Sequence, residues 1–210
     1  MKSAEFNRVM AESLGLPLKT VTTYTRFLKE AGLLTTGARG VNAPDMTPMD
    51  AARTLIAVLA SDGPSQAVER VRRFGPMPFD PNFDIVWPHY ANIGQARYSA
   101  TYEGETFEEA LAFLFSRYQV LGIDGASSFF LRNVVSVRIE PFDILGELVQ
   151  WGMEDGRPVR EEVAPFKGDP YDSQFPKITG HIRTTRMVTG DIFSLVGIML
   201  AASDEEASEG

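Results

Sequence analysis

The polar side chains best suited to recognition lie close together between residues 19 and 26. Lys19, Thr20, Thr22, Thr23 and Arg26 supply both cations and hydroxyl groups within this short segment. Hydroxyl groups hydrogen-bond to the edges of nucleotide bases, the threonine methyl group packs against the methyl group of thymine, and cations bind phosphate. These residue types favour reversible binding to a nucleic acid over covalent chemistry.

The residues that must position these side chains have the spacing of a helix-turn-helix. Ala11 is small where two helices would approach each other, and Gly15 follows where the chain must turn with a positive φ. Val21 comes six residues later, where the second helix would pack back against the first. This pattern is moderately specific, and a helical hairpin that only packs, or that contacts protein, is the alternative.

A helix is predicted on each side of Gly15. The first covers residues 3–14, with an apolar stripe of Phe6, Met10 and Leu14. The second runs from Pro17 or Leu18 to Ala31 and ends before Gly32, a residue that favours the position after a helix. Its inner side chains are expected to be Val21, Tyr24 or Thr25, and Leu28, which leaves Lys19, Thr20, Thr22, Thr23 and Arg26 outward.

A glycine-rich segment, residues 35–43, follows the second helix and has the length of a wing, with Arg39 between Gly37 and Gly40. Residues 3–46 resemble winged helix-turn-helix transcription regulators. The resemblance implies double-stranded DNA as the partner and the second helix in the major groove. The implied DNA-binding residues are Lys19, Thr20, Thr22, Thr23, Arg26 and Arg39.

Two features depart from this family. A further helix usually precedes the pair, yet only five residues precede Phe6, so the helix predicted over residues 47–60 is expected to complete the core unless the chain begins upstream. Pro17 also stands where a side chain that caps the helix is common. If the 47–60 helix packs against Phe6, Met10 and Leu28 and leaves Thr22, Thr23 and Arg26 exposed, the DNA-binding interpretation holds.

The rest of the chain predicts an α+β fold with a boundary in the proline-rich segment 75–81. Residues 1–75 would form a helical, winged-helix-like domain, and residues 76–203 a mixed domain of mainly antiparallel sheet with two or three packed helices. Strands are expected over residues 95–102, 133–139, 148–153 and 178–188, and a helix is expected after Thr106, with a stripe that reaches Tyr118. An apolar helix over residues 190–202 would be either central in the core or a dimer element, and the acidic residues 204–210 would be disordered.

Composition limits the function classes. The net charge of −8 is divided unevenly, with +3 on residues 1–75 and −11 on the remainder, so one end of the protein suits a polyanion. The 210 residues include no cysteine, which excludes disulfides and thiolate chemistry. The longest apolar stretch, residues 192–202, is about half the length of a membrane span, and we expect no membrane partner and a cytoplasmic location.

Enzymatic interpretations have little support. His89 and His181 have no partner at metal-ligand spacing, and adjacent acids such as Glu108 and Glu109 do not face each other on a helix. Arg183 and Arg186 fall on opposite faces of a regular strand. The aromatic residues Phe79, Phe83, Trp87 and Tyr90 are expected to fasten the linker to the second domain, with a ligand pocket or base stacking as the alternative. We expect no enzyme activity, no cofactor and no metal.

The sequence therefore predicts a sequence-specific, DNA-binding transcription regulator that acts by binding only and works as a homodimer, because a single recognition helix gives modest affinity. Residues 32–52 also loosely resemble segments of phage-derived bacterial proteins of unassigned role. That resemblance leaves an alternative from another class, a phage-type structural or assembly protein whose helical head contacts protein.

Overall fold

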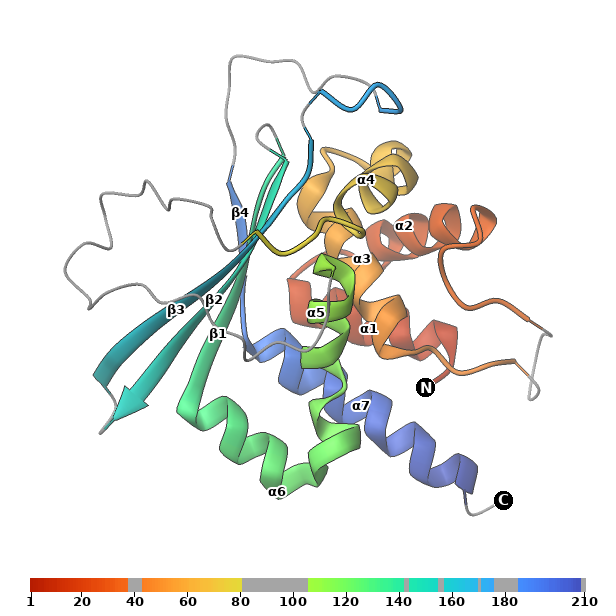
Figure 1. Ribbon diagram of the computed structural model, residues 1–210. Helices are drawn as coiled ribbons and strands as arrows, with labels where there is room; N and C mark the ends of the chain where they lie inside the picture. Colours follow the sequence, from red (N-terminus) through yellow and green to blue (C-terminus); the bar gives the residue numbers. More distant parts are fainter. Residues whose placement is uncertain are drawn as a thin grey trace.

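The computed structural model describes residues 1–37, 43–80, 106–141, 144–154, 157–169, 171–175 and 185–208. Within these ranges the chain is α+β, as predicted, with its labelled helices to one side of an antiparallel sheet (Figure 1). The helices are α1 (Ser3–Leu14), α2 (Leu18–Glu30), α3 (Pro48–Ala60), α4 (Ala67–Phe74), α5 (Phe107–Phe115), α6 (Arg117–Arg132) and α7 (Asp191–Ser208). The strands are β1 (Asn133–Glu140), β2 (Leu145–Glu154), β3 (Arg157–Lys167) and β4 (Arg186–Thr189).

The sheet is four-stranded in the order β3-β2-β1-β4, and every neighbouring pair is antiparallel. Val137 of β1 lies opposite Leu148 of β2 on one side and Val188 of β4 on the other. Val135, Val137 and Ile139 alternate along β1 and are buried in the cluster that the helices share. This alternation sets the register, because a slip of one residue would turn them to the other face.

Helix α3 lies at the centre of the helical layer and is capped as its sequence predicts. Thr47 and Asp50 form a capping box, in which the Asp50 amide donates to Thr47 Oγ1 at 3.2 Å and the Thr47 amide donates to Asp50 Oδ2 at 2.7 Å. The Asp50 carboxylate also accepts from the amide of Thr35 at 2.7 Å and so holds the chain that leaves α2. A cap of this kind stabilises a helix by about 1 kcal/mol.

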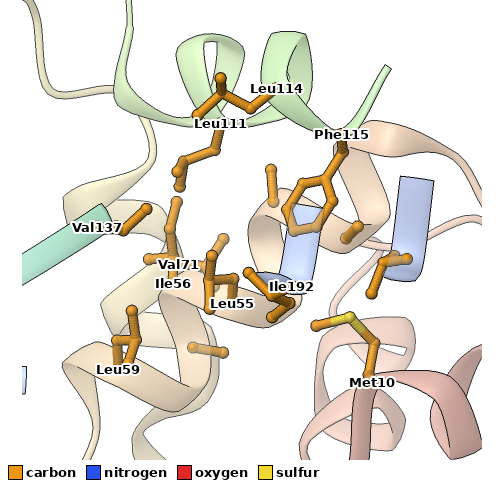
Figure 2. Packing of buried hydrophobic residues seen from close by; sticks show 14 of the residues in the cluster. Met10, Leu55, Ile56, Leu59, Val71, Leu111, Leu114, Phe115, Val137 and Ile192 are labelled. Atoms are coloured by element: carbon orange, nitrogen blue, oxygen red, sulfur yellow. The ribbon is translucent and has the colours of Figure 1, made fainter. Parts of the chain in front are cut away.

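The centre of the core lies where α3 meets helices from both ends of the chain. Figure 2 shows Leu55 and Ile56 of α3 among Met10 of α1, Phe115 of α5 and Ile192 of α7. All five side chains are almost completely buried. Residues on both sides of the expected boundary at residue 75 thus belong to one hydrophobic cluster. The two parts of the chain share this core instead of each having its own.

The proline-rich segment 75–81, expected as a linker, is hydrogen-bonded where the structure describes it. The Asp80 amide donates to the Pro165 carbonyl at 2.9 Å, and the Lys167 amide donates to the Pro78 carbonyl at 3.2 Å, so this segment extends the edge of the sheet at β3. The Phe107 amide donates to the Met77 carbonyl at 2.9 Å, which ties the segment to the start of α5. It joins the helical head to the sheet rather than spacing them apart.

An ion pair strengthens the same junction. Arg53 of α3 donates through Nε to Glu108 Oε2 at 2.9 Å and through a terminal nitrogen to Glu108 Oε1 at 3.1 Å, and its other terminal nitrogen donates to the Leu33 carbonyl at 3.0 Å. The hydrogen bond to Glu108 raises the pKa of Arg53 above its usual value. Glu108 lies in the first turn of α5, where the helix dipole also favours a negative charge.

Several sequence predictions need correction. The helix after Thr106 ends at Phe115, and a separate helix, α6, carries Tyr118 and contains Gly122 with φ 67° and ψ 177°. The strand β3 was not predicted. Helix α7 continues to Ser208, so residues 204–208 are helical where disorder was expected. The strand expected over residues 95–102 lies outside the described residues.

Helix α7, expected either in the core or as a dimer element, packs in the core along one side. It buries Ile192, Phe193, Val196 and Leu200 in the shared cluster, while Leu195 and Ile198 are 53% and 39% exposed. The helix is therefore part of the core on one side and presents apolar side chains on the other.

Candidate DNA-binding surface

The turn between α1 and α2 has the geometry that its sequence predicts. Gly15 adopts φ 63° and ψ 28°, and the Leu16 amide donates to the Ala11 carbonyl at 2.9 Å. These left-handed angles favour glycine, and the hydrogen bond closes the end of α1. Ala11 and Val21 are both buried, so the small residue and the returning residue lie inside as expected.

Helix α2 starts and ends with backbone hydrogen bonds alone. Pro17 precedes it and makes no side-chain cap, while its carbonyl accepts from the amide of Thr20 at 2.9 Å. At the other end Gly32 has φ 70°, and the Leu33 amide donates to the Leu28 carbonyl at 2.9 Å. The predicted helix bounds are thus confirmed to within a residue or two.

Helices from both halves of the chain hold the helix-turn-helix in place. α2 packs against α1, α3 and α4, and α1 packs against α2 and α7. Phe6, Met10 and Leu28 are completely buried in the cluster that includes α3. The helix expected to close the core therefore contributes to it, and α7 adds a contact on α1 that the sequence did not indicate.

The outward face of α2 carries most of the predicted DNA-binding residues. Lys19, Thr22 and Arg26 are exposed, at a spacing that places them on one side of the helix. Thr23 is half-buried, and its hydroxyl donates to the Lys19 carbonyl at 2.8 Å. Thr22 and Arg26 are thus exposed, as expected from their positions on the helix.

Thr20 differs from the other predicted residues. It is half-buried and lines a cavity between α2, α3 and β4, so its side chain lies beside the outward face rather than at its centre. Arg39 lies outside the described residues. The flanks of the expected wing that the structure describes, residues 34–37 and 43–46, contain no strand.

The charge on this surface is positive but partly compensated. Lys19 has no ion-pair partner among the described residues, whereas Arg26 lies 3.7 Å from Glu30 and above the ring of Phe27. On α1, Arg8 pairs with Glu12 at 3.0 Å. Exposed pairs of this kind contribute little energy, so Glu30 holds Arg26 only weakly.

Sequence reasoning missed the role of Arg186, which joins the sheet to the end of α3. One terminal nitrogen donates to the carbonyls of Leu59 and Ser61 at 3.0 and 2.8 Å, and the other donates to Asp62. The carbonyls at a helix C-terminus lack intrahelical partners and attract cations. Strand alternation could not reveal this contact, because its partners lie more than a hundred residues away in the chain.

The described residues offer no candidate metal site and no candidate membrane span. Among them, no group of three or more histidine, cysteine, aspartate or glutamate side chains could hold a metal ion. No helix within the described ranges has the length and apolar character needed to cross a membrane. His89 and His181 lie outside the described part, as do Phe83, Trp87, Tyr90 and Arg183, whereas Phe79 packs its ring edge on Phe166 at 5.9 Å.

Comparisons with protein-family models, with curated proteins and with solved structures found no match.

Proposed function

We propose that this protein is a sequence-specific DNA-binding regulator of transcription that acts by binding alone. One observation carries the proposal: a helix-turn-helix with a glycine turn presents Lys19, Thr22 and Arg26 as exposed side chains on one face of α2. Such a helix fits the major groove, where threonine contacts base edges and cations contact bases or phosphates.

Charge distribution supports the same proposal. Residues 1–75 carry a net charge of +3 and the remainder −11, so the acidic part is repelled by DNA while the helical head approaches it. This asymmetry orients the protein on the duplex.

We propose a homodimer as the binding unit, since one short helix reads only a half-site. The exposed Leu195 and Ile198 lie one turn apart on α7, and Val120 and Ile123 are exposed on α6, which packs against α7. Sedimentation of the wild type and of Leu195→Asp would test this surface. A monomer at micromolar concentration in both would refute the dimer.

Anisotropy titration of a fluorescent random duplex with the full chain tests DNA binding. Affinity should fall steeply between about 50 and 200 mM salt, because each phosphate contact releases counterions. Lys19→Ala and Arg26→Ala should each weaken binding and reduce the salt slope by about 1 per site. Arg8→Ala, which removes an exposed arginine from α1, is the matched control and should leave the slope unchanged.

The base contacts require a separate measurement. Thr22→Ala should leave binding to random duplex unchanged and relax the preference at one position of a site selected from a random library. The full chain is used throughout, because the head shares its core with α5 and α7. Absence of binding at low salt would refute the proposal.

The alternative is a phage-type structural or assembly protein, and one observation favours it. Leu18 is 49% exposed at the start of α2, where a partner protein could cover it. Under this alternative Leu18→Ser would weaken the protein contact, whereas the DNA titration would show no salt-dependent binding.

A further inference from the structure

A cavity of about 340 Å³ lies between the helix-turn-helix and the sheet. Its apolar wall comes from the turn after α1, the end of α3 and β4, and includes Leu14, Leu16, Val58, Leu59 and Val188. Small-molecule sites in proteins have this size and this mainly apolar lining, with a few polar groups that fix orientation.

The polar groups of the cavity come from α2 and β4. Thr20 and Tyr24 line it from α2, and Arg186 lines it from β4. Tyr24 is only 4% exposed, and its hydroxyl makes no hydrogen bond with any described residue. Because Tyr24 lines the cavity, its hydroxyl can donate a hydrogen bond to a molecule bound there.

The surroundings of Tyr24 favour a negatively charged group. Arg186 interacts electrostatically with Tyr24. Arg70, whose side chain is buried with 6% exposure, interacts electrostatically with Arg186. The Nε of Arg70 is buried without a hydrogen-bond partner. Two acids offset these cations in part: Asp62, which is 77% exposed, pairs with Arg186, and Glu69 lies 3.4 Å from Arg70.

We propose that this cavity binds a small monocarboxylate with an apolar body. The carboxylate accepts a hydrogen bond from the Tyr24 hydroxyl and lies beside Arg186. The apolar body lies against the aliphatic wall. A charged acceptor makes the stronger hydrogen bond, and exclusion of water from the apolar body adds affinity.

The position of the cavity connects such a ligand to α2, and this step rests on the proposed function. Thr20 and Tyr24 lie on the inner side of the helix whose outer side carries Lys19, Thr22 and Arg26. A ligand that fits the cavity stabilises this placement of α2 relative to α3 and β4. The same position of α2 also presents the outer side chains to DNA. The ligand should therefore increase DNA affinity, and DNA should increase ligand affinity by the same factor.

Calorimetric titration of the full chain with octanoate and 2-naphthoate, each compared with its uncharged carboxamide, tests the site. At least one carboxylate should bind at millimolar concentration or below, about tenfold more tightly than its carboxamide. Tyr24→Phe, which removes only the hydroxyl, should weaken carboxylate binding about tenfold and carboxamide binding by less, because the neutral amide oxygen accepts the weaker hydrogen bond.

A cavity-filling variant locates the binding. Val58→Phe should abolish it, whereas Val134→Phe, the same substitution at a site on β1 that is 43% exposed, should have no effect. Thermal unfolding checks that each variant is folded, and Tyr24→Phe carries the test if Val58→Phe is not. Absence of binding by all four compounds, or wild-type affinity in a folded Val58→Phe, would overturn the proposal.

DNA titration with and without saturating carboxylate separates this inference from the proposed function. DNA affinity should rise several-fold in the wild type and stay constant in Val58→Phe. Equal affinities would overturn the connection to α2. Carboxylate binding without any DNA binding would refute the regulator and leave the cavity site standing, whereas DNA binding without carboxylate binding would overturn only the cavity site.

Discussion

The ion pair between Arg53 and Glu108 predicts how the two halves of the chain unfold. Arg53→Met keeps most of the aliphatic side chain but removes two hydrogen bonds to Glu108 and one to the Leu33 carbonyl. Hydrogen bonds to charged groups contribute about 1.5–3 kcal/mol each when fully buried. Here the two side chains are 28% and 18% exposed, so solvent weakens the pair.

We therefore expect Arg53→Met to lower the free energy of unfolding by about 2 kcal/mol in total. For a chain of this size that is a fall in Tm of about 4–8 °C. Glu108→Gln should cost less, about 1 kcal/mol, because the amide still accepts one hydrogen bond. The double variant should show a coupling of about 1 kcal/mol, since either change alone already breaks the pair.

Calorimetry and urea unfolding of the four proteins in this cycle measure these quantities. All four should unfold in a single transition, because residues on both sides of position 75 are buried in one cluster. Additive effects of the two substitutions would refute the energetic role of the pair. Two separate transitions in Arg53→Met would refute the shared core and restore two independent domains.

Three further predictions concern the turn, the cap of α3 and the buried tyrosine. Gly15→Ala should cost about 1–2 kcal/mol in urea unfolding from the left-handed backbone alone, because its Cβ would meet nothing within 4 Å; a neutral effect would contradict the turn geometry. Asp50→Ala should cost about 2–4 kcal/mol, since it deprives two amides of their acceptor, whereas Glu12→Ala, at an exposed ion pair with Arg8, should cost less; equal losses would contradict this role. Burial raises the pKa of Tyr24, while Arg186 lowers it and Asp62 raises it further. The contribution of this tyrosine to the free energy of unfolding is therefore fully present below about pH 10 and is lost at higher pH. The difference in urea midpoint between the wild type and Tyr24→Phe should therefore change in favour of Tyr24→Phe as pH rises from 8 to 11, and a constant difference would refute this linkage.

The sequence by itself determined where α1, α2 and α3 begin or end, because the residues responsible lie within one turn of each other. Gly15 and Gly32 end α1 and α2 because the backbone adopts a positive φ at both positions, which glycine does without strain. Thr47 with Asp50 starts α3 through hydrogen bonds within one turn. The outward placement of Lys19, Thr22 and Arg26 followed from helical spacing, since the inner positions were already marked by Val21 and Leu28.

Elements that depend on distant partners were not predictable from the sequence. Strand β3 contains Pro158 and Pro165, which argue against a central strand, and it is tolerated because it lies at the sheet edge. Helix α6 follows α5 almost directly, and its exposed Val120 and Ile123 gave no clear apolar stripe. Neither the edge position of β3 nor the contact of α6 with α7 can be predicted from residues that are neighbours in the sequence.

The tertiary structure alone decided how the head and the sheet fit together. A boundary at the prolines of residues 75–81 followed from their local preference for extended chain, yet that extended chain pairs with β3 and leads directly into α5. Arg186 appeared to be one arginine on an alternating strand until β4 placed it at the end of α3, beside Tyr24. Helix α2 could be found from spacing, whereas the cavity behind it exists only because segments far apart in the chain meet there.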